Sequence, residues 1–421
     1  MPWSYFYAAG RDPIVLIAGI VIIILLIVIA IGNINLSCKD NKIRIAFYLA
    51  FFIQLIILII DNYIVDFPLI NVDARVHEAM GWFSYENNVN IGRGNYNYLI
   101  INPIYKLLKI RTAAIFGAIN IIAHILISLN IYKIFNILKI EKKLKRFLMM
   151  IVILSPISLV MRAGLLREAI IILFASYSLK AFIEYVFYKN PFSIIKMFLY
   201  LTISSLFHSG TIFLTMGYFI YLLGGGKNQK ILQWGILLVA VIGFILFKDQ
   251  FLEKVGAGDV DKILAYNNSA ELKSAGSVYL ESITTNSLGQ IVVFLPLFMF
   301  YFLYSPTPEM IRGVLDIITL LLNSSIYIYI TIIGIKTYKK IRKNLSKREK
   351  QIVKALLFSA LLTIAVFSVG TRNAGTAMRH RDKVLPFLIV IFAIIRNKYF
   401  IELRYRKIQK RDIGRDLNET N

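Results

Sequence analysis

The sequence predicts an all-α, polytopic integral membrane protein. Of its 421 residues, 57% are hydrophobic, and the mean hydropathy is +0.66. Apolar runs recur from Pro13 to Ile395, and the first of them, Ile14–Ile34, matches the roughly 20 residues that a helix needs to cross a bilayer. This run is too long for a signal peptide and has no small-residue cleavage site, so we expect a retained first helix.

The net charge of +24 is concentrated in short segments beside apolar helices. Lys336–Lys350 holds eight basic residues and one acid, the tail from Arg396 holds eight and four, and Lys142–Arg146 holds four basic residues. Such segments follow the positive-inside bias and attract anionic lipid headgroups. We therefore expect contact with anionic lipids and no nucleic-acid partner.

The same bias predicts the orientation. Lys39, Lys42 and Arg44 place the first loop in the cytoplasm, which puts the N-terminus outside and the C-terminus inside. We expect one membrane domain over residues 1–396 and a basic cytoplasmic tail over 397–421.

The expected helices follow in order. Those near 14–36 and 45–63 are followed by an outer loop over about 65–111 and a return run over 112–135, and runs over 147–161 and 165–187 form a hairpin with its outer tip at Met161–Glu168. The basic C-terminal segments place the connection Gly370–Lys383 outside as well. Three charged segments from distant parts of the chain should therefore meet at one surface.

The middle of the chain leaves alternatives open. Met197–Leu223 is one kinked helix or two short ones, because Phe207, His208, Ser209 and Gly210 interrupt it. The segment 248–288 carries four lysines and six acids, which favours an outer loop, although its side depends on how many runs cross completely. We expect 11 to 13 membrane segments, some of them short or re-entrant.

Several classes of chemistry lack their signatures. The single cysteine, Cys38, excludes a disulfide framework, and the four histidines show no zinc-binding spacing. No Walker loop, dinucleotide fingerprint or G-x-S-x-G motif is present, so we expect no cofactor and no metal.

Gly370–Phe387 is the most informative segment. It sets five side chains that carry or can carry positive charge between two apolar runs: Arg372, Arg379, His380, Arg381 and Lys383. Cations at a membrane boundary are costly unless they are compensated, and guanidinium groups match phosphate oxygens bidentately. The alternative is ordinary snorkelling or topology-setting charge.

Two further segments contain candidate residues. In the first outer segment, Asp73 and His77 share a helix face, with Arg75, Glu78 and Arg93 nearby. There Asp73 is a candidate base or a simple helix cap, and the aromatic rings are sugar platforms or an interfacial belt.

Met161–Ala169 interrupts apolar sequence with Arg162, Arg167 and Glu168, which form either a structural ion pair or a buried cation site with a neighbouring base. His208 is a core residue or a catalyst.

The order of these motifs resembles a known group of proteins. Asp73 and His77, R-x-G-x-x-R-E at Arg162–Glu168, FHSG at Phe207–Gly210, P-x-P at Pro306–Pro308 and G-T-A-M-R-H-R at Gly375–Arg381 look like bacterial Wzy-type and EpsG-like polysaccharide polymerases. This group resembles GT-C glycosyltransferases in turn, whose first outer loop carries an acidic residue.

The resemblance implies a polymerase of O-antigen, capsule or exopolysaccharide repeat units in the bacterial cytoplasmic membrane. Its substrate would be a polyprenyl-pyrophosphate-linked oligosaccharide, with a flippase and a chain-length regulator as partners. The base would be Glu168, Asp73 or His77. The pyrophosphate would bind Arg162, Arg167, Arg372, Arg379, His380 and Arg381, with Arg75, Arg93 and His208 in support.

Two other functions stay open. One is a GT-C glycosyltransferase that uses a polyprenyl-phosphate sugar. The other, from a different class, is a lipid-oligosaccharide flippase, which also needs arginines within the membrane but needs no base at the outer face.

Overall fold

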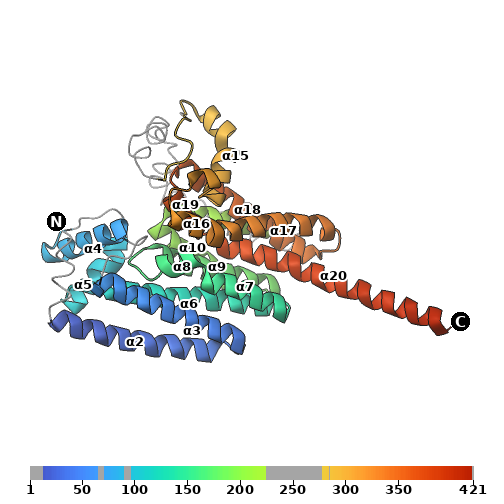
Figure 1. Ribbon diagram of the computed structural model, residues 1–421, viewed down its shortest axis with the longest axis horizontal. Helices are drawn as coiled ribbons and strands as arrows, with labels where there is room; N and C mark the ends of the chain where they lie inside the picture. The colour runs from blue at the N-terminus through green and yellow to red at the C-terminus, as the bar shows by residue number, and fades with distance from the viewer. Residues whose placement is uncertain (1–12, 65–70, 90–95, 224–276, 284, 420–421) are drawn as a thin grey trace.

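The computed structural model describes residues 13–64, 71–89, 96–223, 277–283 and 285–419, and these residues form an all-α bundle (Figure 1). The described residues contain no strand and only an isolated bridge between Val278 and Asn373. The expected all-α class is confirmed.

The first part of the bundle contains the helices from Pro13 to Tyr188. Its α-helices are α2 (Pro13–Ser37), α3 (Asn41–Ile59), α4 (Asn71–Glu86), α5 (Asn102–Leu108), α6 (Ala114–Ile137), α7 (Lys142–Leu154), α8 (Pro156–Met161) and α9 (Glu168–Tyr188). Helix α3 continues as a π-helical turn, Ile60–Ile64, and a second such turn, Asn97–Ile101, precedes α5.

The second part begins with α10 (Phe192–Phe207), a 3-10 turn (Ser209–Leu214) and α11 (Thr215–Leu223). After residues 224–276 it continues through α15 (Leu288–Tyr304), a short turn (Pro308–Met310), α16 (Val314–Thr319), a π-helical turn (Leu320–Ser324), α17 (Ser325–Ile341), α18 (Lys347–Val369), α19 (Ala374–Arg381) and α20 (Leu385–Glu419).

Six helical segments in the described residues are long and apolar enough to cross a membrane: Pro13–Ser37, Asn41–Ile64, Ala114–Ile137, Glu168–Tyr188, Asp316–Ile341 and Lys347–Val369. The bent pair α19 and α20, which meet at 58°, makes a seventh if it is one span. The protein is therefore a multi-pass membrane protein. The expected number of 11 to 13 includes shorter segments and part of 224–276, which lies outside the described residues, so that number stays a prediction.

Helix α6 lies at the centre of the bundle and α2 at its edge. In the most apolar part of each helix, 78% of α6 residues are buried but only 17% of α2 residues. The side chains of Ile17, Ile24 and Val28 of α2 are apolar and exposed. They therefore fit the lipid-facing side of an outer helix.

The expected break in the sixth apolar run falls at His208. This residue ends α10 in an extended conformation (φ −157°, ψ 102°), and the chain then forms the 3-10 turn before α11. Of the two alternatives left open for this run, the structure has two short helices. The break places His208 beside His380 of α19.

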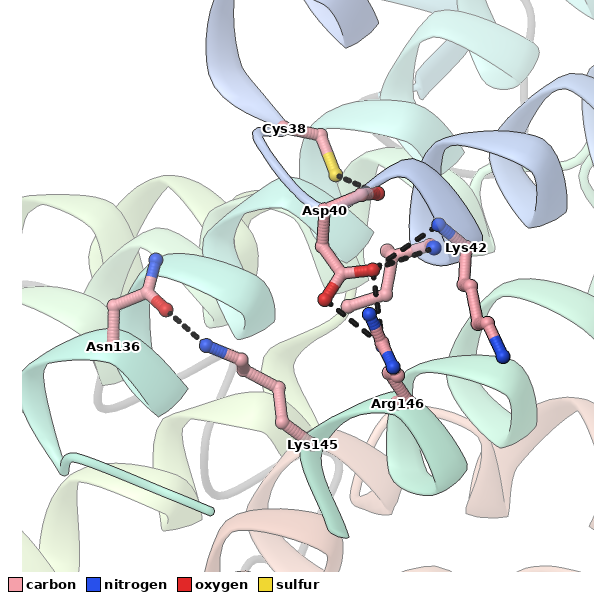
Figure 2. Close-up of polar contacts among 7 residues, drawn as sticks. Cys38, Asp40, Lys42, Asn136, Lys145 and Arg146 are labelled. Atoms are coloured by element: carbon pink, nitrogen blue, oxygen red, sulfur yellow. Dashed lines mark hydrogen bonds and ion pairs between the residues drawn. The ribbon is translucent and has the colours of Figure 1, made fainter. Parts of the chain in front are cut away.

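The basic segments gather at one end of the bundle. There Asp40 caps α3 by accepting hydrogen bonds from the backbone N–H groups of Lys42 and Ile43, and it forms an ion pair with Arg146 at 3.0 Å (Figure 2). Burial alone would raise the pKa of the Asp40 carboxyl. The hydrogen bonds from Arg146 and the two backbone groups, together with the charge of Arg146, outweigh burial and lower this pKa.

The C-terminal basic segments reach the same end. Glu141 accepts hydrogen bonding from Arg404, and Lys340 lies over the ring of Tyr399. Helices α4 and α5 lie at the opposite end in Figure 1, with α6 spanning between the two ends. One end of the bundle is therefore basic, and the first expected outer segment, which contains α4 and α5, lies at the other end.

The orientation predicts the outcome of cysteine labelling. In a Cys38→Ser background, Asn88→Cys should react with an impermeant maleimide from outside the cell, and Asn344→Cys should react only after permeabilisation. Both positions are exposed, Asn88 just after α4 and Asn344 just after α17. Labelling of Asn344→Cys in intact cells would reverse the predicted orientation.

A second prediction concerns the close packing of α6. A Cβ atom at Gly117 would lie 2.6 Å from the carbonyl oxygen of Ala163 and 2.2 Å from Leu58 Cδ1, so Gly117→Ala should lower stability by about 1–3 kcal/mol. Gly32→Ala is the matched control, because nothing lies within 4 Å of its Cβ position. Thermal unfolding in detergent measures both, and equal midpoints would contradict the prediction.

Candidate functional site

The residues 162–167 that connect α8 and α9 are held by the centre of the bundle. Asn120 of α6 is fully buried, and its amide donates hydrogen bonds to the carbonyl oxygens of Gly164 (2.6 Å) and Leu166 (2.8 Å). Backbone groups inside a membrane need internal partners, and this side chain supplies them where the helix stops. Asn120 thereby fixes the position of the Arg167–Glu168 pair.

The connector is also tied to the bend between α19 and α20. Arg162 donates a hydrogen bond to Asp382 across 2.5 Å, and both side chains are at most 9% exposed. Ser158 Oγ donates to the same carboxylate at 3.0 Å. A buried ion pair needs such additional hydrogen bonds to offset the loss of hydration of its two charges.

The next residue, Lys383, lies beside Glu168 at the other end of the connector. Its ammonium nitrogen is 3.9 Å from Glu168 Oε1, and the two side chains are 0% and 8% exposed. Arg167 and Arg379 also interact electrostatically with Glu168, and both are only half-buried. We name these four residues, Glu168, Lys383, Arg167 and Arg379, the Glu168 cluster.

The first outer segment reaches this cluster through Tyr96. Burial, and secondly the nearby Glu168 carboxylate, raise the pKa of Tyr96. The ring of His77 meets Tyr96 edge-on with 6.2 Å between ring centres, and its Nδ1 lies 3.2 Å from Asn97 Oδ1. The predicted meeting of three distant segments is therefore observed around Glu168.

Two histidines lie on the other side of the cluster. The rings of His208 and His380 are 5.1 Å apart, and the ring of Phe367 is 4.9 Å from the former and 5.1 Å from the latter. Lys383, Arg379 and Arg167 act on His380 electrostatically. The break after α10 thus places His208 next to the late basic segment.

The Arg381 side chain is held by groups of the protein itself. It is fully buried, and its guanidinium donates to the carbonyl oxygens of Leu303 (2.8 Å) and Ser305 (2.6 Å) and to the Asn323 side chain. It also lies 4.7 Å from the centre of the Tyr327 ring. Arg381 therefore fastens the end of α15 and the start of α17 to α19.

Arg372 is also buried away from solvent. Its guanidinium donates to the carbonyl oxygen of Ile283 at 2.5 Å and lies 4.9 Å from the centre of the Phe298 ring. Burial lowers the pKa of Arg372. The neighbouring Tyr279 hydroxyl donates to the carbonyl oxygen of Thr371, which fixes the turn between α18 and α19.

Other predicted residues form a second polar cluster on α4. Arg111 binds the Glu78 carboxylate bidentately at 2.8 and 2.9 Å, Tyr105 donates to it at 2.7 Å, and Arg75 lies 3.9 Å from Asp61. The Trp82 ring packs against Tyr105 and other side chains of this region, so its contacts are internal. The Asp73 side chain and Arg93 lie outside the described residues.

Sequence reasoning missed Asp382, and it counted Lys383 among the cations of its segment without giving it a role in the site. A signal was present: an arginine and an acid six residues apart in the connector are matched by an adjacent acid and lysine near the chain's last span. The fold pairs the arginine of the connector with the acid of the bend, and the acid of the connector with the lysine of the bend. In the described residues, no group of three His, Cys, Asp or Glu side chains is placed to hold a metal ion.

The ion pair makes a stability prediction. Arg162→Ala leaves the buried Asp382 carboxylate uncompensated, which should lower stability by about 3–5 kcal/mol. Arg162→Ala combined with Asp382→Ala should recover part of this loss, because neither charge is then buried alone. Arg167→Ala, at a half-buried position of the same connector, is the control and should unfold close to the wild type. Thermal unfolding in detergent tests all three, and a double variant less stable than Arg162→Ala would contradict the pairing.

Comparison with known proteins adds no family. No family model matches the chain, and neither does any curated protein or solved structure.

Proposed function

We propose that this protein is a glycosyltransferase that polymerises lipid-pyrophosphate-linked oligosaccharide units at the outer face of a bacterial cytoplasmic membrane. The observation that carries the proposal is the Glu168 cluster. One buried carboxylate lies among three cations, one of them fully buried and two half-buried. A base beside cations is the arrangement that transfer from a pyrophosphate donor requires.

In the proposed reaction, Glu168 accepts the proton of the acceptor hydroxyl. The acceptor oxygen then bonds to the anomeric carbon of the donor, the bond between that carbon and the pyrophosphate oxygen breaks, and the electron pair leaves with the polyprenyl pyrophosphate. The donor itself supplies the driving force, so no nucleotide is consumed.

Arg167 and Arg379 are the proposed ligands of the pyrophosphate. Both interact with Glu168, and both are half-buried, so part of each side chain is open to a substrate. Guanidinium groups bind phosphate oxygens in pairs, and each well-placed donor contributes roughly 3–4 kcal/mol to a developing negative charge. The His380 and His208 pair borders this region and would contact the saccharide or the phosphate.

The other predicted arginines have a different proposed role. Arg162 and Arg381 are bound to protein groups at 2.5–2.8 Å and are buried, as is Arg372. We propose that they hold the connector, the α15 end and the turn before α19, and so act on catalysis through the position of the Glu168 cluster.

Reconstitution tests the function. Purified protein supplied with lipid-pyrophosphate-linked oligosaccharide should lengthen it without ATP, as seen by gel mobility or mass spectrometry. Glu168→Gln keeps the shape of the side chain but removes the base, and it should reduce extension by at least about 100-fold. Arg167→Lys and Arg379→Lys should recover little activity, because an ammonium lacks the bidentate fork.

The controls separate the alternatives. Asp73→Asn should retain extension if Glu168 is the base, and loss of activity in Asp73→Asn alone would move that role to the first outer segment. Extension only from a polyprenyl-phosphate sugar would identify a GT-C monosaccharide transferase. Transfer of labelled lipid across liposomes without lengthening, unaffected by Glu168→Gln, would identify a flippase and overturn the proposal.

A further inference from the structure

The Lys383 side chain is fully buried, whereas a lysine that sets topology or snorkels keeps its ammonium group in water. Its side chain is 0% exposed, and no atom of the described residues accepts a hydrogen bond from its ammonium nitrogen. The Phe367 ring lies 5.2 Å from that nitrogen, and Glu168 Oε1 lies 3.9 Å from it. A buried ammonium is costly unless a charge compensates it, and its nearest carboxylate is Glu168.

The neighbouring ion pair holds this lysine in place. Asp382, one residue earlier, is bound by Arg162 at 2.5 Å and by Ser158 at 3.0 Å. The two ends of the 162–168 connector are thus matched by two consecutive residues of the α19–α20 bend. With Asp382 fixed, the Lys383 side chain is directed towards Glu168 from the protein side.

Substrate binding changes the field at Glu168. Arg167 and Arg379 are half-buried, and in the proposed function a pyrophosphate would neutralise both and add negative charge beside the carboxylate. A buried carboxylate without compensating positive charge takes up a proton and cannot act as a base. The cation that no substrate can reach is Lys383.

We infer that Lys383 is a positioning residue, which keeps the Glu168 carboxylate ionised and oriented when the pyrophosphate donor is bound. This inference rests on the proposed function of Glu168 as the base. Lys383 acts through Glu168 and makes no contact with the substrate.

A double-mutant cycle tests the coupling. Lys383→Met should lower kcat for extension by about 100-fold with KM for the donor changed by less than about threefold, because only the base is affected. In a Glu168→Gln background, the same substitution should have no further effect on the residual rate. Lys189→Met is the matched control, because Lys189 also lies over an aromatic ring, that of Tyr185 at 5.1 Å, but at the end of α9 away from Glu168.

Infrared spectroscopy gives a readout that does not need activity. Lys383→Met should show the carbonyl band of a protonated carboxyl group on addition of inorganic pyrophosphate, and Glu168→Gln should remove that band. Lys383→Gln replaces the methionine variant if the latter does not fold. An unchanged kcat, losses that multiply in the double variant, or no new band would each overturn the role of Lys383. Absence of extension by the wild type would overturn the proposed function alone, since the infrared result would still decide whether Lys383 keeps Glu168 ionised.

Discussion

The arrangement of the candidate site depends on charges that are buried between two interruptions of the membrane helices. One interruption is the 162–167 connector, and the other is the bend at Asp382 and Lys383. The pairs Arg162–Asp382 and Glu168–Lys383 join them. The connector supplies the cation of the first pair and the anion of the second, so each charge lies beside an opposite charge. Any shift of one segment along the other would bury unpaired charges, which cost several kcal/mol each.

This constraint explains why polar and small residues occur in the most buried helix. Asn120 and Gly117 lie in the first two turns of α6, where both face the connector. Asn120 supplies hydrogen bonds to the backbone where the helix is interrupted, and Gly117 allows the chain to approach closely. The irregular connector is therefore supported directly by α6.

The two ends of the bundle use their arginines differently. At the basic end, Arg146 binds Asp40 with 28% of its side chain exposed, which is typical of a boundary charge that interacts with lipid headgroups. At the opposite end, Arg162, Arg372 and Arg381 are each at most 3% exposed and bind carbonyl or carboxylate oxygens. Arg167 and Arg379 differ from these three because each is only half-buried.

The sequence by itself determined the helical membrane class, the position of the break at His208 and the three segments that meet, because apolar run length and charge bias are local properties. Only the tertiary structure decided which charge compensates which: Arg162, for which the sequence left a structural ion pair or a substrate site open, pairs with Asp382, and Lys383 pairs with Glu168 across more than 200 residues. Such pairings depend on how the spans pack, and one sequence contains no measure of that packing. Arg167 and Arg381 look alike in the sequence, and their burial alone distinguishes a group open to ligands from one that holds the fold together.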